Sequence, residues 1–290
     1  MAFFGVLRAG LIVVNVNPLY TPHELQRRIK ESGAQAVVVL ETFAHKLAEF
    51  IGLAELKALV TTARGDLLPA LRRWLTNFVA RHISHRVTPY RGHHAIAFRL
   101  ALVEGSSNSL IKVDIVQDDI ALLQYTGGTT GIPKGAILSH GNLVANIVQI
   151  ASWIGVELKE GVEVAITPLP LFHIFSLTGN PLTFISIGSH NLLITDPCDI
   201  TARVAFLRRT RFTAISGVNT LFNALLSHPD FAKVDFPGLK LSIGGGGAVH
   251  SAVAKRWKAV TGIPIIEAMD RRRLLRLSAS IRLISRIIRE

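Results

Sequence analysis

The amino-acid sequence predicts an α/β fold built from mostly parallel β-sheets covered by helices. Short apolar runs rich in β-branched residues alternate with longer amphipathic runs along most of the 290 residues. The short runs are apolar throughout, which is typical of strands buried on both faces of a parallel sheet. Hydrophobic residues make up 49% of the chain and charged residues 18%, so the composition favours a large buried core over disorder.

The first predicted elements already show this alternation. The run Leu11 to Val16 predicts a buried strand. The next segment predicts a helix over Pro22 to Ser32, because Thr21 suits the N-cap, proline suits the first helical position and Gly33 suits the end. A second strand and a second helix are predicted at 36–40 and 43–56.

The alternation is predicted to return in the second half of the chain. Strands are expected at 120–125, 136–139, 163–167, 191–194, 212–215, 239–243 and 264–266. Helices are expected at 141–154, 199–209, 219–227 and 249–261. Strands that alternate with helices in this way favour a parallel sheet with helices on both faces.

Residues 67–86 carry a basic amphipathic pattern. Apolar residues recur there at helical spacing, and arginine and histidine fill the other positions. This pattern fits a helix lying on an anionic membrane surface, and it also fits an ordinary surface helix packed on its own domain. A second stretch, 164–195, contains no Asp, Glu, Lys or Arg, but it is interrupted by three prolines and is interpreted as buried core rather than a membrane helix.

Charge and cysteine content narrow the classes of function. The formal net charge is +12, and seven arginines against two acidic residues in 269–290 supply much of it. The basic excess suits anionic partners such as nucleotide phosphates, CoA or an acidic membrane. The single cysteine, Cys198, excludes an internal disulfide framework, and Met1 to Phe4 lack the basic start of a signal peptide.

The strongest motif is the run Tyr125-Thr-Gly-Gly-Thr-Thr-Gly-Ile-Pro-Lys-Gly135, directly after a predicted strand. Its glycines allow close approach of the backbone to a ligand, and successive backbone N–H groups can form an anion-binding nest. The hydroxyls of Thr126, Thr129 and Thr130 add donors, and Lys134 adds a positive charge, so the run suits a polyphosphate. It is not a Walker A loop, because proline precedes Lys134 and glycine follows it.

This run resembles the phosphate-loop signature of the adenylate-forming superfamily, which includes acyl-CoA synthetases, luciferases and peptide-synthetase adenylation domains. Four further segments resemble family motifs in the family's order. They are Gly5-Val-Leu-Arg-Ala-Gly10 through Asn17-Pro-Leu-Tyr-Thr-Pro-His-Glu-Leu25, Pro168-Leu-Pro-Leu-Phe-His-Ile-Phe175, Gly217-Val-Asn-Thr220 and Ser242-Ile-Gly-Gly-Gly-Gly-Ala248. The residues of these motifs are most similar to those of bacterial long-chain fatty acid–CoA ligases, and the resemblance covers residue 3 to about residue 267.

The resemblance implies a fold, a reaction and a set of site residues. The fold would be part of the large N-terminal domain of acyl-CoA synthetases, and the reaction would join a long-chain fatty acid to CoA through an acyl-adenylate, with ATP, Mg²⁺ and CoA required. The implied catalytic residues are Lys134, Thr130 and His173. The implied nucleotide-binding residues are Thr126, Gly127, Gly128, Thr129, Thr130, Gly131, Lys134, Gly245, Gly246, Gly247 and Ala248. The implied substrate-pocket residues are His173, Gly217, Val218 and Gly244.

The sequence departs from the family pattern after Glu267. Where the family reads Gly-Tyr-Gly-Leu-Thr-Glu, this chain reads Ala268-Met-Asp-Arg-Arg-Arg273, so the family's adenine-stacking tyrosine aligns with Met269 and its Mg²⁺-binding glutamate with Arg273. No metal ligand is therefore assigned. We expect a partial first α/β subdomain at 1–110 with the basic amphipathic segment, an AMP-binding subdomain at 111–268, and an aberrant Arg-rich tail at 269–290.

Three functional readings follow from these observations. The first is a long-chain fatty acid–CoA ligase by family, with this chain an inactive fragment truncated at both ends. The second is a non-catalytic fragment that binds nucleotide or acyl groups, and the third is a basic membrane-surface module. A nucleic-acid partner is not expected, because no aromatic–basic interleaving or nucleic-acid motif is present. The expected location is cytoplasmic, with peripheral contact at the inner face of the membrane.

Overall fold

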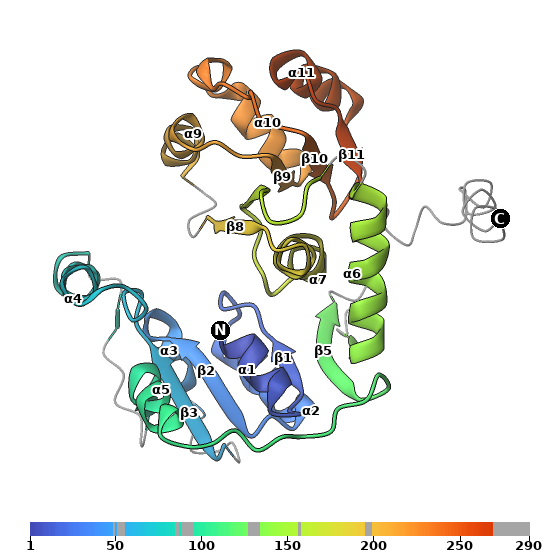
Figure 1. The fold of residues 1–290 in the computed structure, drawn as a ribbon. Coiled ribbons are helices and arrows are strands. Elements are labelled where there is room, and N and C mark those ends of the chain that lie inside the picture. The colour runs from blue at the N-terminus through green and yellow to red at the C-terminus, as the bar shows by residue number, and fades with distance from the viewer. Residues whose placement is uncertain are drawn as a thin grey trace. The chain divides into compact units, whose positions relative to one another are not determined.

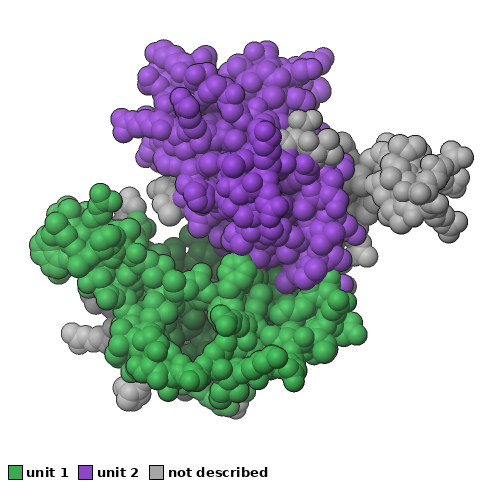
Figure 2. Space-filling model, in the orientation of Figure 1, with its two compact units in different colours: residues 1–141 green, residues 142–290 purple. Residues whose placement is uncertain are grey.

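The computed structural model describes residues 1–48, 50, 56–84, 87–88, 95–126, 134–155, 158–194 and 199–268, with the backbone alone at 126 and 134. The chain forms two compact units, residues 1–141 and 142–290, shown in different colours in Figure 2. The division expected at residue 110, between two subdomains of the family, stays a prediction.

The first unit contains two three-stranded sheets, of which β1, β2, β3 and β5 are labelled in Figure 1. One sheet has the order β1-β5-β6, with β1 (Val13–Asn15) parallel and β6 (Lys134–Ser139) antiparallel to β5 (Ile120–Thr126). The other is parallel throughout and has the order β2-β3-β4, from β2 (Ala36–Leu40), β3 (Ala58–Thr62) and β4 (Ala95–Ala97). The helical elements are α1 (Ala2–Arg8), α2 (Pro22–Ser32), α3 (Glu41–Ala48), α4 (Ala70–Phe78), η2 (Val79–Ile83) and α5 (Phe98–Ser106).

Helix α2 shows how closely local sequence determines structure in this unit. The Thr21 side chain accepts a hydrogen bond from the Glu24 backbone N–H, and the Glu24 carboxylate accepts one from the Thr21 backbone N–H, which completes a capping box. Gly33 ends the helix with φ of 64°, in the left-handed region that glycine adopts most readily. Ile29 then packs with Leu47 and Leu59 in a small core.

The second unit is built on one parallel five-stranded sheet with the order β11-β10-β9-β7-β8. Its strands are β7 (Val164–Thr167), β8 (His190–Leu193), β9 (Ala214–Gly217), β10 (Leu241–Gly244) and β11 (Ile265–Glu267). Its helical elements are α6 (His140–Ile154), which starts just before the unit boundary, α7 (Ile174–Leu177), η3 (Thr178–Leu182), α8 (Thr183–Ser186), α9 (Ile200–Arg209), α10 (Asn219–Ser227), η4 (Phe231–Lys233) and α11 (Ser251–Thr261).

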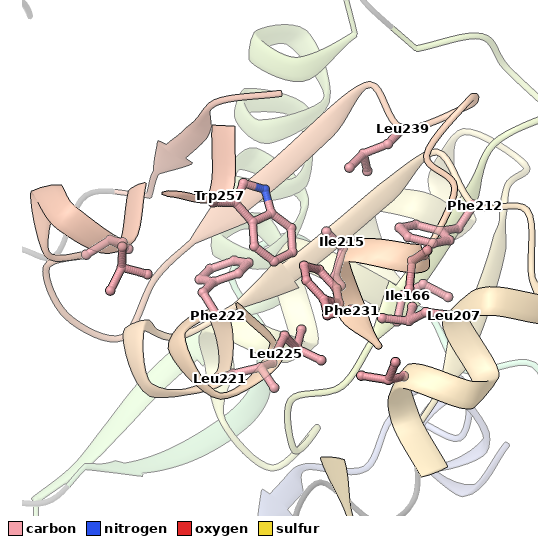
Figure 3. Packing of buried hydrophobic residues seen from close by; sticks show 14 residues of the cluster. Ile166, Leu207, Phe212, Ile215, Leu221, Phe222, Leu225, Phe231, Leu239 and Trp257 are labelled. Atoms are coloured by element: carbon pink, nitrogen blue, oxygen red, sulfur yellow. The ribbon is translucent and has the colours of Figure 1, made fainter. Parts of the chain in front are cut away.

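The main core of the second unit lies between this sheet and helices α9, α10 and α11 (Figure 3). The fully buried Trp257 packs edge-on against Phe222, with ring centroids 4.7 Å apart, and also contacts Phe231. Its indole N–H donates a 3.0 Å hydrogen bond to the Ser242 hydroxyl, so its one polar atom is satisfied inside the core. Strands that are apolar on both faces and paired in parallel confirm the predicted fold class.

The structure differs from the sequence prediction at several places in the first unit, where helix α1 was also not predicted. The helix predicted at 43–56 ends at Ala48, and Phe50 lies in a turn. Strand β3, and then β4 with α5, were not predicted. The Ala58–Thr62 run is only five residues long and directly follows the predicted helix, so its pattern could not be separated from a helical continuation.

The uncharged stretch at 164–195 folds as β7, α7, η3, α8 and β8, and several of its residues are fully buried, including Phe184 and Thr183. No helix in the described ranges is long and apolar enough to cross a membrane.

Candidate functional site

The carboxyl ends of three neighbouring strands bring most of the expected pocket residues of the second unit together. Gly244, the last residue of β10, is in register with Gly217 of β9 and Glu267 of β11. Beyond these ends, the Gly245 N–H donates a 3.0 Å bond to the Gly217 carbonyl, and the Ala268 N–H donates a 2.7 Å bond to the Gly244 carbonyl. Open parallel sheets bind ligands at this edge, which makes it the candidate site of the unit.

The glycine-rich turn after β10 has two parts with different physical roles. A Cβ on Gly244 would lie 2.6 Å from Val249, and one on Gly245 would lie 2.2 Å from the Phe175 ring, so both glycines are required for close packing. Gly246 has φ of 70°, and Gly246, Gly247 and Ala248 are exposed. The exposed half of the turn therefore presents backbone groups, rather than side chains, to whatever binds there.

Gly217 and Val218 form the turn after β9. A Cβ on Gly217 would lie 2.8 Å from the Phe222 ring, so this position also excludes a side chain. Val218 is half-buried, and its Cγ1 atom lies 3.3 Å from where a Cβ on Gly246 would be, which makes the two turns neighbours. The Asn219 amide oxygen accepts a 2.9 Å bond from the His250 backbone N–H and ties the turn after β9 to the start of α11.

His173 lies on the segment that follows β7. It is exposed, stands as N-cap of α7 without a capping hydrogen bond, and its ring is 4.9 Å from that of Phe172. Phe175, two residues further on, contacts Gly245, so this segment reaches the same carboxyl edge as the two glycine turns. The aromatic contact of Phe175 was missed at the sequence level, although it lies within the motif that contains His173.

The phosphate-loop motif lies largely outside the described residues. This applies to Gly127, Gly128, Thr129, Thr130 and Gly131. The two ends of the loop are described: Thr126 closes β5 and Lys134 opens β6, and they are paired in the antiparallel register. The motif is therefore a hairpin connection between two adjacent strands of the first unit.

The base of this hairpin contains a feature that the sequence did not reveal. The Tyr125 ring lies under the guanidinium of Arg28, 4.6 Å from the ring centroid, and a Cβ on Gly135 would lie 3.2 Å from the same ring. Arg28 is 4% exposed and also forms a 2.7 Å ion pair with Glu31. Burial raises the pKa of Tyr125, the Glu31 charge raises it further and Arg28 lowers it, so the hydroxyl stays protonated at neutral pH.

Metal ligands are not gathered anywhere in the described part of the chain, where no group of three or more His, Cys, Asp or Glu side chains could hold an ion. The resemblance implies that the family's acidic Mg²⁺ ligand corresponds to Arg273, which carries donors only and cannot ligate a metal. Arg273 lies outside the described residues, as do Met269 and the rest of the Arg-rich tail. No magnesium site is formed by the described residues, and the requirement for Mg²⁺ stays a prediction.

The sheet, its ligand edge and the phosphate-loop motif together define a class of nucleotide-using enzymes. The chain belongs to the AMP-binding enzyme family, whose model matches residues 1–269. It is 48% identical over 267 residues to a "Long-chain-fatty-acid--CoA ligase" of Escherichia coli O157:H7, a match that covers 92% of this chain and 48% of the relative. The chain thus spans about half the length of the curated relatives it matches.

Solved structures agree with the fold. The anthranilate CoA ligase AuaEII in complex with anthranoyl-AMP superimposes with a TM-score of 0.75 at 22% identity, covering 92% of this chain and 47% of that one. ATP-bound MatB from Rhodopseudomonas palustris superimposes with a TM-score of 0.68 at 22% identity, covering 91% and 46%. At this level of identity the likeness establishes the fold alone.

Proposed function

We propose that this chain is part of a long-chain fatty acid–CoA ligase, which converts a fatty acid, ATP and CoA into acyl-CoA, AMP and pyrophosphate through an acyl-adenylate. The observation that carries the proposal is the 48% identity to a relative of that name over 92% of this chain. The phosphate-loop motif after β5 supports it, because glycine, threonine and lysine at this spacing suit a polyphosphate.

In this proposal, each group of site residues binds a different part of the substrates. Thr126 to Gly131 and Lys134 contact the phosphates of ATP, and Lys134 and Thr130 stabilise charge that develops during adenylation. The exposed turn Gly246 to Ala248, with Gly245 at its start, lies along the nucleotide. His173, Gly217, Val218 and Gly244 line the pocket for the acyl group. CoA is the second substrate, and its thiol displaces AMP.

This chain by itself is proposed to bind nucleotide without forming acyl-adenylate at a useful rate. Adenylation places charge on phosphate oxygens, and catalysis consists mostly of positioning and of stabilising that charge. A cationic Arg273 at the family's metal-ligand position and Met269 at its adenine-stacking position remove two of the required interactions. The second candidate function, a non-catalytic nucleotide-binding or acyl-binding fragment, is favoured by the same two residues.

Nucleotide-dependent protection of Lys134 tests the binding step. The full 290-residue chain is treated with a lysine-acylating reagent with and without ATP, and labelling is read by peptide mass spectrometry. We expect ATP to protect Lys134 and to leave the exposed Lys258 on α11 unchanged, which makes Lys258 the matched control. Equal labelling of Lys134 in both samples would remove it from the site.

Fatty-acid-dependent exchange of labelled pyrophosphate into ATP tests the chemical step. We expect protection of Lys134 but exchange far below that of a relative of full length. Loss of one donor to a transition state typically costs on the order of 10² to 10³ in rate. Exchange near the relative's rate would show that the family's tyrosine and glutamate are dispensable here.

The proposed location of this ligase is cytoplasmic, with peripheral contact at the inner face of the membrane. The proposed membrane contact involves helix α4 of the first unit and not the carboxyl edge of the sheet in the second unit.

A further inference from the structure

Helix α4 presents its apolar side chains to solvent, whereas Asn77 on its other side bonds to the protein. Leu71, Trp74, Leu75 and Phe78 recur at helical spacing and are 78%, 61%, 53% and 41% exposed. These four residues are here called the α4 apolar face. Surface helices normally bury this stripe, so its exposure makes the α4 apolar face a candidate docking surface.

The contacts on the other side of α4 explain this orientation. The Asn77 amide oxygen accepts a 2.8 Å hydrogen bond from the Gly65 N–H, and a Cβ on Gly65 would lie 2.8 Å from the Arg73 carbonyl oxygen. The helix backbone therefore packs directly on the turn at Gly65. Ala80, two residues beyond α4 in η2, is 5% exposed and completes the inward side.

The composition of the exposed side matches the boundary between lipid headgroups and acyl chains. Trp74 and Phe78 stack on each other, with ring centroids 5.3 Å apart, and the amphipathic ring of tryptophan favours that boundary. Leu67, Leu68 and Ile83 extend the apolar surface at both ends, with exposures of 62%, 39% and 63%. At nine residues α4 is only about 14 Å long, so it can lie on a bilayer but cannot cross it.

Charge favours an anionic surface over a second copy of this chain. No acidic residue occurs between Leu67 and Ser84, and the exposed Arg72 lies beside the apolar face. Arg81, in η2, forms a 2.7 Å ion pair with Glu41 and remains half-exposed. Two copies joined through this face would bring two cationic margins together, whereas anionic headgroups would pair with each of them.

We propose that α4 docks flat on an anionic membrane surface, with Leu71, Trp74, Leu75 and Phe78 in the boundary region and Arg72 against lipid phosphates. This rests on the proposed location of the ligase and identifies the surface responsible. It also gives a physical reason for that location, because a peripheral enzyme can take up a long-chain fatty acid from the leaflet in which it dissolves.

Co-sedimentation of the full chain with vesicles tests the apolar contact. Vesicles of phosphatidylglycerol mixed with phosphatidylcholine are compared with phosphatidylcholine alone, without ATP, so the outcome is independent of the ligase chemistry. We expect Leu71→Ser with Trp74→Ser to lower the partition coefficient about tenfold. The matched control is Val144→Ser with Val148→Ser on α6, where both side chains are 56% exposed, and it should bind like the wild type.

A second pair of variants tests the charge. Arg72→Gln should weaken binding to the anionic vesicles about fivefold, and Arg208→Gln on α9 should not. High salt should reduce the wild-type binding as well. Equal binding to both vesicle types, or full binding by the Leu71 and Trp74 variant, would overturn the proposal.

Two further measurements keep the result interpretable. Circular dichroism should show that both double variants keep the wild-type fold, and a blue shift of tryptophan emission on vesicle binding should be absent in Trp74→Phe. Sedimentation velocity without lipid examines self-association: a dimer that the Leu71 and Trp74 substitutions abolish would assign the face to a second copy and refute membrane docking.

Discussion

Glu163 and Lys240 form an ion pair, and substituting Lys240 should lower the free energy of unfolding more than substituting Glu163. Glu163 precedes β7 and its side chain is fully buried, whereas Lys240 precedes β10 and is 32% exposed. The two are joined by a 2.6 Å hydrogen bond, and the Lys159 N–H donates another 2.6 Å bond to the same carboxylate oxygen. Removing the lysine leaves a buried anion behind, whereas removing the carboxylate leaves a cation that can turn toward water.

The magnitudes follow from this difference in exposure. Lys240→Met should lower the free energy of unfolding by about 2–4 kcal/mol, near the usual cost of leaving a buried charge unpaired. Glu163→Gln should cost only about 1–2 kcal/mol, because the amide keeps an oxygen acceptor for the Lys159 N–H. In the double variant the two losses should not add, and the difference is the coupling energy of the pair.

The pH dependence provides an independent check on the same pair. Burial raises the pKa of Glu163, but hydrogen bonds from Lys240, Thr213 and Lys159 outweigh burial and hold it below its ordinary value of 4.5. A carboxyl group whose pKa is lower in the folded state stabilises the fold above its unfolded pKa. That contribution is lost as the pH falls through the folded pKa, and Glu163→Gln should lack this part of the acid sensitivity.

Urea denaturation followed by tryptophan emission measures these changes, because the buried Trp257 reports on the second unit. The reasoning would be refuted if Lys240→Met were as stable as the wild type, or if Glu163→Gln were the more damaging of the two. A coupling energy near zero in the double variant would show that the two side chains do not interact in solution.

Two other predictions use the same measurement. Gly245→Ala should cost about 1–3 kcal/mol, because its methyl group would overlap the Phe175 ring, whereas Gly247→Ala should change stability by less than about 0.5 kcal/mol since no atom lies within 4 Å of its Cβ position. A similar loss for both glycines would contradict the packing role assigned to Gly245. Thr21→Ala should cost about 1 kcal/mol by removing the capping box of α2, and no change in unfolding would show that Glu24 caps the helix alone.

Local signals made the well-predicted elements predictable. The bounds of α2 are the predicted ones because the N-cap threonine, the proline and the terminal glycine all act at the ends of the helix, through residues close in sequence. Strand β2 also has its predicted bounds, since four of its five residues are Val or Leu. Strand β4 was not predicted, because its Ala-Ile-Ala is too short to show an alternating pattern and its partner strand β3 lies far away in the sequence.

In the candidate site, too, the features set by neighbouring residues were predictable from the sequence, and the contacts between distant residues were not. The glycine turns at 217 and 244–248 were visible as motifs, and the structure places both at the carboxyl edge of one sheet. The contact of Arg28 with Tyr125 was invisible, because it joins residues almost a hundred positions apart through a ring and a buried cation. The contact of Phe175 with Gly245 was hidden for the same reason.

Strand β10 connects the buried ion pair of the second unit to the glycine turn that is proposed to contact the nucleotide. The strand begins next to Lys240, which forms the ion pair with Glu163 at the amino ends of β7 and β10. It ends at Gly244, where the glycine turn begins. The four residues between these points span only about 13 Å as an extended strand. A shift of the strand at Lys240 would therefore also displace the turn. Under the proposed function, a substitution at Lys240 is expected to alter nucleotide affinity in molecules that remain folded.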